Sequence, residues 1–301
     1  MRYDKLIKYL EEKNIPYELN KSTKELVSFN IGGNADIVVY PSKAEHIKDI
    51  ACILKNKNIK FTFLGNGTNT YFSDMGYNGV IISTKHFNEM ITDGEYLTCM
   101  CGVSMTMACV CARKHSLGGL EFAYGIPGNV GGCVYMNGSA FNKDMSNVVY
   151  KSSVLDLSTG NIIELNLNDH KYGMKHSVFM ENKNYFILSA TFKLNRGDRE
   201  AINAQMQSNL SKRKANQPLD LPSAGSVFKR PKNAFASKLI DDAGLKGRCV
   251  GGAEVSELHA GFIVNKGKAS SSDVRELIEI IKKEIVNRFG ILLEEEIIYI
   301  E

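Results

Sequence analysis

FAYGIPGNVGGCVYM, residues 122–136, is the stretch of sequence that decides the fold. Glycine or proline occupies positions 125, 127, 128, 131 and 132 of this otherwise apolar run. Because glycine has no side chain, its peptide N–H groups can approach a phosphate closely, and the start of a helix favours an anion. The run therefore indicates main chain that wraps around a ligand, although an ordinary turn accounts for it equally well by itself.

A second glycine loop, residues 65–69 with the sequence GNGTN, directly follows an apolar strand predicted over residues 61–64. Two loops of this kind can share one diphosphate, so together they favour a dinucleotide over two ordinary turns. The chain contains neither G-x-G-x-x-G with an acid about 20 residues later nor GxxxxGK(S/T). The diphosphate must therefore be held by a fold other than the Rossmann fold or the P-loop fold.

The composition is that of a globular protein, because 301 residues, 44% hydrophobic and 23% charged, allow two or three domains. No apolar run approaches the ~20 residues that span a bilayer, and the first residues lack the apolar block of a signal peptide. We therefore expect a cytoplasmic monomer or weak dimer without a membrane partner. A net charge of +4, with basic and acidic residues interleaved, argues against nucleic acid and leaves anionic small molecules as natural partners.

Seven cysteines, an odd number, fit reduced thiols better than a disulfide framework. Cys99, Cys101, Cys109 and Cys111 form two C-x-C pairs, whereas structural zinc sites use C-x₂₋₄-C spacing. The first pair shares one face of a predicted strand, and the second pair points apart on a predicted helix. We therefore predict no metal site and treat these cysteines as small apolar residues of the core.

Hydrophobic periodicity and turn signals divide the chain into three predicted sections, residues 1–83, 84–196 and 197–301. The predicted helices cover residues 3–13, 42–57 (opened by a capping box of Ser42 and Glu45), 105–115, 199–213, 236–243 and, with Ser271 or Ser272 as N-cap, 271–288. The predicted strands cover residues 61–64, 80–82, 96–101, 148–157, 161–165, 185–194 and 296–300. The sections should pack as a continuous body, because no long linker separates them.

Six segments, in this order, resemble the UDP-N-acetylenolpyruvoylglucosamine reductase family: SFNIGGNADIVVYP, LGNGTNTYFSDMGYNGVII, GLEFAYGIPGNVGGCVYMN, PLDLPSAGSVFKRP, AGLKGRCVGGAEVSELHAGFIVN and LLEEEIIYI. The resemblance covers about residues 28–300. It implies a mixed α+β fold, with an FAD-binding module of two subdomains of the vanillyl-alcohol-oxidase type and a C-terminal α+β domain that covers the substrate. The three sections would then be FAD-binding subdomain 1, FAD-binding subdomain 2 and the substrate-binding domain.

The resemblance also implies the reaction. In this family NADPH reduces FAD, and the flavin then reduces the enolpyruvyl ether of UDP-N-acetylglucosamine to UDP-N-acetylmuramate, a step of peptidoglycan precursor synthesis. Hydride goes to C3 of the enolpyruvyl group and a proton goes to C2. The length of the chain and the short passage between its middle strands resemble the shorter of the family's two types, which lacks an inserted tyrosine-bearing loop.

Two catalytic roles follow from the resemblance. Ser226, in PSAGSVFK, occupies the position of the family's proton donor, and a turn-capping hydroxyl after Gly225 is the alternative. Serine is a very weak acid, so neighbouring cations and hydrogen bonds must stabilise the charge that develops. Glu296 matches the family glutamate that binds and polarises the substrate carboxylate, but the adjacent Glu294 and Glu295 leave the register open by one residue.

The third catalytic role falls on Lys175, where this chain departs from the family. The family pattern Tyr-Arg-x-Ser-x-Phe is matched by MKHSVF, residues 174–179, so lysine replaces arginine and methionine replaces tyrosine. Lysine keeps the positive charge but lacks the planar guanidinium that grips a carboxylate through two parallel hydrogen bonds. Lys171 and His176 are nearby alternatives for this cation.

The resemblance also assigns FAD contacts to the two glycine loops and to the paired glycines of IGGNAD. These predicted cofactor-binding residues are Gly32, Gly33, Gly65, Asn66, Gly67, Thr68, Asn69, Gly125, Ile126, Pro127, Gly128, Asn129, Gly131 and Gly132. Lys229, His259 and Asn265 are predicted to bind the UDP-sugar. For His259, a hydrogen-bonded core histidine is an equal alternative.

Two competing functions remain open at the level of sequence. Because lysine replaces the family arginine, the chain could be a diverged paralogue that keeps the flavin but has changed or lost its substrate. A sensor that binds a UDP-sugar without turnover is the second alternative. The presence of both Ser226 and Glu296 argues against the sensor, since binding alone does not need a proton donor.

Overall fold

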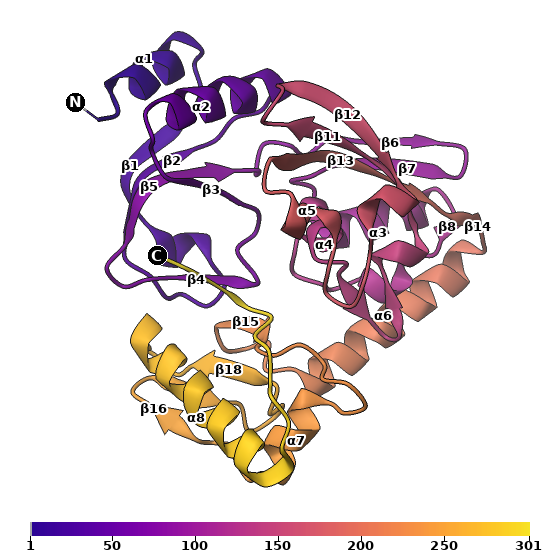
Figure 1. Ribbon diagram of the computed structural model, residues 1–301. Helices are drawn as coiled ribbons and strands as arrows, with labels where there is room; N and C mark the ends of the chain where they lie inside the picture. Colours follow the sequence, from indigo (N-terminus) through magenta and orange to yellow (C-terminus); the bar gives the residue numbers. More distant parts are fainter. Residues whose placement is uncertain (1) are drawn as a thin grey trace. The chain divides into compact units, whose positions relative to one another are not determined.

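The computed structural model describes residues 2–301, which form two compact units (Figure 1). Unit 1 comprises residues 2–19, 37–66 and 79–211, and unit 2 comprises residues 20–36, 67–78 and 212–301. The boundary between them falls inside three strands, β1 (Tyr17–Ser22), β2 (Asn34–Val39) and β5 (Tyr77–Ser83). Each unit therefore combines segments that are far apart in the sequence, and the division into three consecutive sections stays a prediction.

An antiparallel sheet of five strands forms the centre of unit 1, in the order β12-β11-β13-β7-β6. Its strands are β6 (Met90–Asp93), β7 (Tyr96–Met100), β11 (Val149–Asp156), β12 (Asn161–Asn166) and β13 (Tyr185–Lys193). Helix α4 (Val130–Tyr135) packs on β13 and β7, and α3 (Met105–Lys114) packs on α4 (Figure 1). The second glycine loop therefore leads into a helix that lies directly on this sheet.

The remaining elements of unit 1 surround this sheet. The helices are α1 (Asp4–Glu12), α2 (Ala44–Asn56), α5 (Val178–Glu181) and α6 (Arg199–Asn216), whose last residues belong to unit 2. Strand β3 (Phe61–Leu64) pairs in parallel with β5 in a sheet of order β1-β2-β5-β3. Short strands form two further pairs, β8 (Leu117–Gly118) with β14 (Asn195–Arg196) and β9 (Ser139–Ala140) with β10 (Lys143–Asp144). The 3₁₀ turns are η2 (Glu121–Ala123), η3 (Met145–Asn147) and η4 (Leu167–His170).

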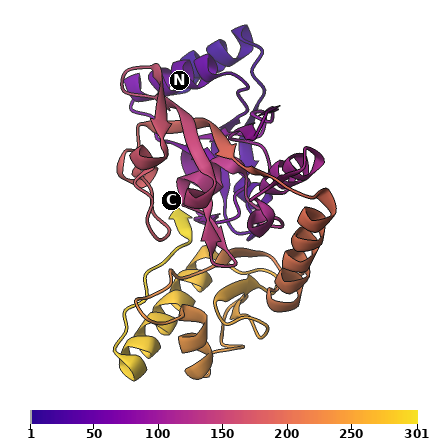
Figure 2. The same cartoon turned by 90° about the vertical axis from the view of Figure 1, so that its right-hand side faces the viewer.

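Unit 2 has its own antiparallel sheet, in the order β15-β18-β17-β16. The strands are β15 (Ser223–Ser226), β16 (Cys249–Val250), β17 (Ala253–Val255) and β18 (Phe262–Asn265), and the helices are α7 (Ala236–Asp242) and α8 (Ser271–Phe289). In the turned view of Figure 2, α8 (yellow) runs beside this sheet, and it contacts β16 and β17. Unit 2 also contains η1 (Thr23–Leu26) and the parallel pair of β4 (Thr70–Phe72) with β19 (Ile298–Ile300).

Helix α8 shows how the sequence pattern builds the core of unit 2. Val274, Leu277, Ile278, Ile281 and Ile285 are buried at helical spacing, so they form one apolar stripe. The stripe belongs to a cluster with the short sheet and with residues 29–31 and 71. A separate cluster forms the core of unit 1.

Most predicted helices and strands are confirmed, and three details are wrong. The N-cap of α2 is Lys43, which makes no side-chain cap bond, so Ser42 does not open that helix. The N-cap of α8 is Ser270, in a capping box with Asp273, because Ser271 is held instead by the carboxylate of Asp74. The last strand begins at Ile298 and not at residue 296, because the N–H of that earlier residue bonds to a different segment.

Three of the four cysteines in the two C-x-C pairs are buried in the core, as predicted. Cys99, Cys101 and Cys109 are buried, whereas Cys111 is half-buried because it points away from Cys109 on α3. Burial raises the pKa of Cys99 and of Cys101 to about 12 each. Within residues 2–301, no group of three or more His, Cys, Asp or Glu side chains could hold a metal ion.

Among the described residues, no helix combines the length and the apolar character that crossing a membrane requires.

The cap of α8 gives a test of this fold. Ser270→Ala should lower the free energy of unfolding by about 1 kcal/mol, because the Ser270 side chain accepts a hydrogen bond from the Asp273 N–H at 3.0 Å. Urea unfolding measures the change. Ser42→Ala is the matched control and should change the free energy by less than ~0.5 kcal/mol. Equal losses in the two variants would contradict the assignment of the cap.

Candidate functional site

Within unit 1, the structure brings the start of the first predicted glycine loop, Gly65 and Asn66, against the second loop. The Asn66 side-chain amide donates a hydrogen bond to the Pro127 carbonyl oxygen at 2.9 Å. Gly65 lies against Asn129, since a Cβ placed on Gly65 would be 2.5 Å from the Asn129 Oδ1 atom. The first two residues of the first loop are therefore direct neighbours of the second loop, as a shared diphosphate requires.

Main-chain pairing fixes the second loop. Met105 N–H donates to the Gly128 carbonyl at 3.0 Å, Val130 N–H donates to Val103 at 2.8 Å, and Gly131 N–H donates to Cys101 at 2.8 Å. The loop thus runs antiparallel to the segment that leads from β7 into α3.

The side chain of Asn129 caps α4 and links it to a neighbouring segment. Its Oδ1 atom accepts a hydrogen bond from Gly132 N–H at 3.1 Å, and its Nδ2 atom donates to Thr84 Oγ1 at 3.0 Å. Asn129 is 3% exposed, so its amide is committed to these structural bonds. A direct contact between its side chain and a cofactor is therefore not supported.

Several glycines serve packing within the protein and not the approach of a ligand. A Cβ on Gly67 would lie 2.3 Å from the Leu26 carbonyl oxygen, and Gly67 has φ +61°. A Cβ on Gly131 would lie 2.8 Å from the Cys101 Cβ. The space beside these glycines is filled by the chain itself, so packing explains them without a cofactor, and their predicted contact with FAD stays a prediction.

The N–H groups of the loops, in contrast, fit an anion. Among the described residues, none accepts a hydrogen bond from the main-chain N–H groups of Gly65 and Asn66, the two residues of the first loop that belong to unit 1. The same holds for Gly125, which has φ +81°, and for Gly128, whereas Ile126 N–H donates to Ala123. Successive N–H groups without intramolecular acceptors form a concave anion site. The residues present therefore fit the diphosphate of FAD.

Gly32 and Gly33 have a structural role. A Cβ on Gly32 would lie 2.1 Å from Thr23 Oγ1, and a Cβ on Gly33 would lie 2.4 Å from the Asp74 carbonyl oxygen and 2.5 Å from the Gly76 nitrogen. The main chain of Gly33 is also paired on both sides, with Ser73 O and with Thr23 N–H. These contacts explain both glycines without a cofactor, so the predicted FAD contact is not supported here.

Unit 2 brings the predicted catalytic residues Ser226 and Glu296 together. Ser226 ends β15 opposite Phe262, and the next residue, Val227, accepts a hydrogen bond from the Glu296 N–H at 2.8 Å. Ser226 is half-buried, and its hydroxyl makes no hydrogen bond to any described residue. The Asn69 amide donates to the Glu296 carbonyl at 2.9 Å. The end of the first glycine loop thus lies beside this pair.

The three adjacent glutamates occupy different surroundings, which bears on the open register. Glu294 is exposed and forms an ion pair with Lys229 at 3.3 Å. Glu295 forms an ion pair with Lys282 of α8. Glu296 is half-buried, and its N–H bonds directly to the residue that follows Ser226. The main-chain bond places Glu296 next to the segment of Ser226, and the register of the catalytic glutamate stays a prediction.

Lys175 lies at the tip of a two-residue hairpin in unit 1. Gly173 and His176 form two main-chain hydrogen bonds with each other, at 3.1 and 3.3 Å, and Lys175 has φ +52°. The hairpin is tied to the end of α4, because the Asn137 amide donates to the Gly173 carbonyl at 2.9 Å and the Ser177 hydroxyl donates to the Tyr135 carbonyl. Helix α4 therefore connects the second glycine loop to the segment that carries Lys175.

The two alternative cations near Lys175 are already paired. His176 Nε2 lies 2.9 Å from Glu181 Oε1, and Lys171 Nζ lies 3.5 Å from Glu181 Oε2. The hydrogen bond from His176 is the main cause that lowers the pKa of Glu181. Lys175 is half-buried, and its role as the catalytic cation stays a prediction.

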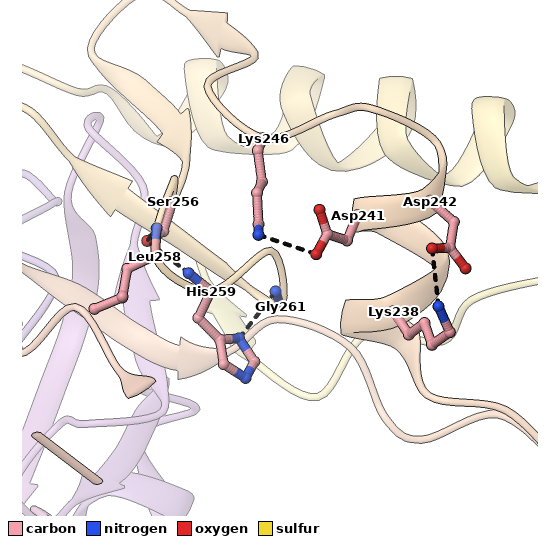
Figure 3. A network of polar contacts seen from close by, with 8 residues as sticks. All are labelled: Lys238, Asp241, Asp242, Lys246, Ser256, Leu258, His259 and Gly261. Carbon is pink, nitrogen blue, oxygen red and sulfur yellow. Dashed lines mark hydrogen bonds and ion pairs between the residues drawn. The ribbon is translucent and has the colours of Figure 1, made fainter. Parts of the chain in front are cut away.

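The predicted substrate-binding residues are mostly occupied within unit 2. His259 Nδ1 accepts a hydrogen bond from Gly261 N–H at 3.1 Å, and the His259 N–H donates to Ser256 Oγ at 3.3 Å (Figure 3). Burial lowers the pKa of His259, which keeps Nδ1 available as an acceptor. These contacts favour the hydrogen-bonded core histidine over a ligand contact.

Asn265 has a structural role, and Lys229 is accessible. Asn265 is buried, its amide donates to the Phe29 carbonyl, and its Oδ1 atom accepts from the Gly267 and Ala269 N–H groups. The structure therefore does not support our assignment of Asn265 to the substrate. Lys229 is 39% exposed in its ion pair with Glu294 and stays a candidate for the UDP group.

Comparison with known proteins identifies the family. The model for the C-terminal domain of UDP-N-acetylenolpyruvoylglucosamine reductase matches residues 217–300, and an FAD binding domain model matches residues 35–166. The UDP-N-acetylenolpyruvoylglucosamine reductase of Clostridium novyi is 43% identical over 91% of this chain and 89% of its own length. The reductase of the same name from Caldicellulosiruptor bescii is 42% identical, over 97% and 93%. The chain belongs to the UDP-N-acetylenolpyruvoylglucosamine reductase family.

A solved structure of the family agrees with this assignment. The UDP-N-acetylenolpyruvylglucosamine reductase of Thermus caldophilus superposes with a TM-score of 0.80 at 27% identity, over 95% of this chain and 99% of that one. The predicted fold class, an FAD-binding module with a C-terminal α+β domain, is confirmed. The FAD-binding model covers both glycine loops, and the reductase C-terminal model covers Ser226 and Glu296.

Sequence reasoning missed the asparagines that connect this family site. The bonds from Asn66 to Pro127, from Asn137 to Gly173 and from Asn69 to Glu296 join segments that are 61, 36 and 227 residues apart. A single sequence carries no periodic signal for such contacts. For Asn66 and Asn69, their position within the first glycine loop indicated a role in the site but did not identify their hydrogen-bond partners.

Gly33→Ala tests whether this glycine serves packing or the cofactor. The added Cβ would meet main-chain atoms of Asp74 and Gly76 at 2.4 and 2.5 Å, so we expect a loss of ~1–3 kcal/mol in the free energy of unfolding. Gly173→Ala is the control, since its Cβ would lie 3.6 Å from the His176 Cβ. A Gly33→Ala variant of wild-type stability that purifies without FAD would show that Gly33 faces the cofactor.

Proposed function

We propose that this chain reduces the enolpyruvyl ether of UDP-N-acetylglucosamine to UDP-N-acetylmuramate, and that Ser226, Glu296 and Lys175 carry the reaction. Membership of the reductase family supports the reaction. The observation that supports the residues is the hydrogen bond between Glu296 N–H and Val227 O, which puts the two predicted catalytic residues of unit 2 side by side. This step belongs to peptidoglycan precursor synthesis, so we also propose that the chain acts in the cytoplasm as a monomer or weak dimer.

The chain is an FAD-dependent oxidoreductase that uses NADPH. When bound, FAD would supply the redox chemistry that carries a hydride from NADPH to C3 of the enolpyruvyl group. The main-chain N–H groups of Gly65, Asn66, Gly125 and Gly128 in unit 1, which have no acceptor among the described residues, would hold its diphosphate. The division of the chain into FAD-binding subdomain 1 (residues 1–83), FAD-binding subdomain 2 (residues 84–196) and a substrate-binding domain (residues 197–301) is part of this proposal.

Ser226 donates the proton that C2 of the substrate receives. Its hydroxyl is half-buried at the end of β15 and makes no hydrogen bond to the described residues, so it can contact substrate directly. A serine hydroxyl gives up a proton only where positive charge and hydrogen bonds stabilise the oxygen it leaves. Cations near the substrate carboxylate would serve this purpose.

Glu296 and Lys175 act on the substrate carboxylate in this proposal. Lys175 offers an ammonium group that neutralises the carboxylate and draws electrons from the adjacent double bond. Glu296 orients the enolpyruvyl group for protonation. Since an ammonium makes single-point contacts, Lys175 holds the carboxylate less rigidly than the guanidinium of the usual family residue.

One anaerobic experiment separates the reductase from its two alternatives. The yellow protein is reduced with NADPH, substrate is added, and the flavin absorbance is followed. Reoxidation by substrate supports the reductase, and reduction without reoxidation supports the diverged paralogue. A protein that binds the UDP-sugar but shows neither half-reaction would support the sensor.

Ser226→Ala tests the proton donor. FAD content and reduction by NADPH should stay near wild type, whereas reoxidation by substrate should slow by ~10²–10⁴, the usual contribution of a positioned general acid. Stopped-flow absorbance of the flavin measures the two half-reactions separately. If both half-reactions slow equally, or if neither slows, Ser226 is not the proton donor.

Lys175 variants test the replacement of the family arginine. Lys175→Arg should preserve or raise the rate of reoxidation by substrate, because a guanidinium can hold the carboxylate through two hydrogen bonds. Lys175→Ala should lower that rate about 10-fold or more, with little effect on reduction by NADPH. Wild-type reoxidation in Lys175→Ala would show that another cation holds the carboxylate.

A further inference from the structure

The main chain of Glu296 is held on both sides. Its N–H donates to the Val227 carbonyl at 2.8 Å, and its carbonyl accepts a hydrogen bond from Asn69 Nδ2 at 2.9 Å. The Asn69 carbonyl in turn accepts a hydrogen bond from the Ile298 N–H at 2.9 Å. Asn69 therefore contacts the chain both at Glu296 and two residues beyond it.

The hydrogen bond from the Asn69 side chain to the Glu296 carbonyl lies just before the paired strands β4 and β19. Strands β4 and β19 pair in parallel from Thr70 and Ile298 onward, and Asn69 immediately precedes β4. Before Ile298 the C-terminal segment leaves β4 and pairs instead with residues 227–229. The Asn69 amide reaches the carbonyl of Glu296 at this point of departure, so it fixes where the segment changes partner.

We propose that Asn69 is a positioning residue for Glu296. The inference rests on the proposed role of Glu296, and it replaces the expectation that the Asn69 side chain contacts the cofactor. With both main-chain polar groups of Glu296 bonded, the carboxylate moves only through its own side-chain torsions. A displacement of about 1 Å in a catalytic group can cost about 10²-fold in rate.

Asn66 offers a matched comparison in the same loop. Its amide also donates to one main-chain carbonyl at 2.9 Å, that of Pro127 in the second glycine loop. The two asparagines therefore make the same kind of bond to different parts of the site, Asn66 to the cofactor loop and Asn69 to the segment of Glu296. Their alanine variants should differ in the half-reaction that they affect.

A double-mutant cycle tests the inference. Asn69→Ala should keep FAD content and reduction by NADPH, and should slow reoxidation by substrate about 10- to 100-fold. In a Glu296→Gln background the same change should slow reoxidation by less than about 3-fold, because the residue that Asn69 positions is already disabled. Asn66→Ala should change the rates by the same factor in both backgrounds.

The outcomes separate this inference from the proposed function. An equal slowing by Asn69→Ala in both backgrounds, or no slowing in the wild-type background, would overturn the positioning role alone. Wild-type reoxidation in Glu296→Gln would instead overturn the proposed role of Glu296 itself. If the alanine variant does not fold, Asn69→Asp gives the same test, since it keeps the size of the side chain but removes the N–H donor.

Discussion

Unit 1 depends on the main-chain pairing between residues 101–105 and 128–131. Its three hydrogen bonds fix the second glycine loop to the segment that enters α3, and so set where both α3 and α4 begin. The pairing needs a glycine at position 131, because the Cys101 side chain occupies the space that a Cβ would take. The close contact between Cys101 and Gly131 therefore helps to fix the position of the second glycine loop.

In unit 2, main-chain pairing likewise fixes the position of the C-terminal segment. Residues 294–298 pair first with residues 227–229, the segment that follows β15, and then with β4, so one segment joins two parts of the unit. Both lysine-paired glutamates of this segment are engaged with neighbours, one with Lys229 and one with Lys282. Main-chain pairing therefore fixes the position of Glu296, the glutamate to which we assign the catalytic role.

The sequence predicts the fold class, the family and most elements, because hydrophobic periodicity and six ordered segments are local signals. The prediction from sequence fails where the same residue pattern is compatible with two different structural roles. Ser270, Ser271 and Ser272 all look like helix caps, and only the reach of Asp74 to Ser271 decides among them. A glycine that admits a phosphate and a glycine that admits a carbonyl oxygen also look alike in sequence, as Gly33 shows. Such choices depend on contacts between distant segments.

The distribution of cysteines has a consequence for measuring motions of the molecule. All the buried thiols, Cys99, Cys101, Cys109 and Cys133, belong to unit 1, whereas Cys52 and Cys249 are exposed. A buried thiol with a raised pKa reacts with an alkylating reagent only when its surroundings open. The rate at which these four thiols are alkylated, measured by mass spectrometry, therefore reports how often unit 1 opens, without any introduced cysteine.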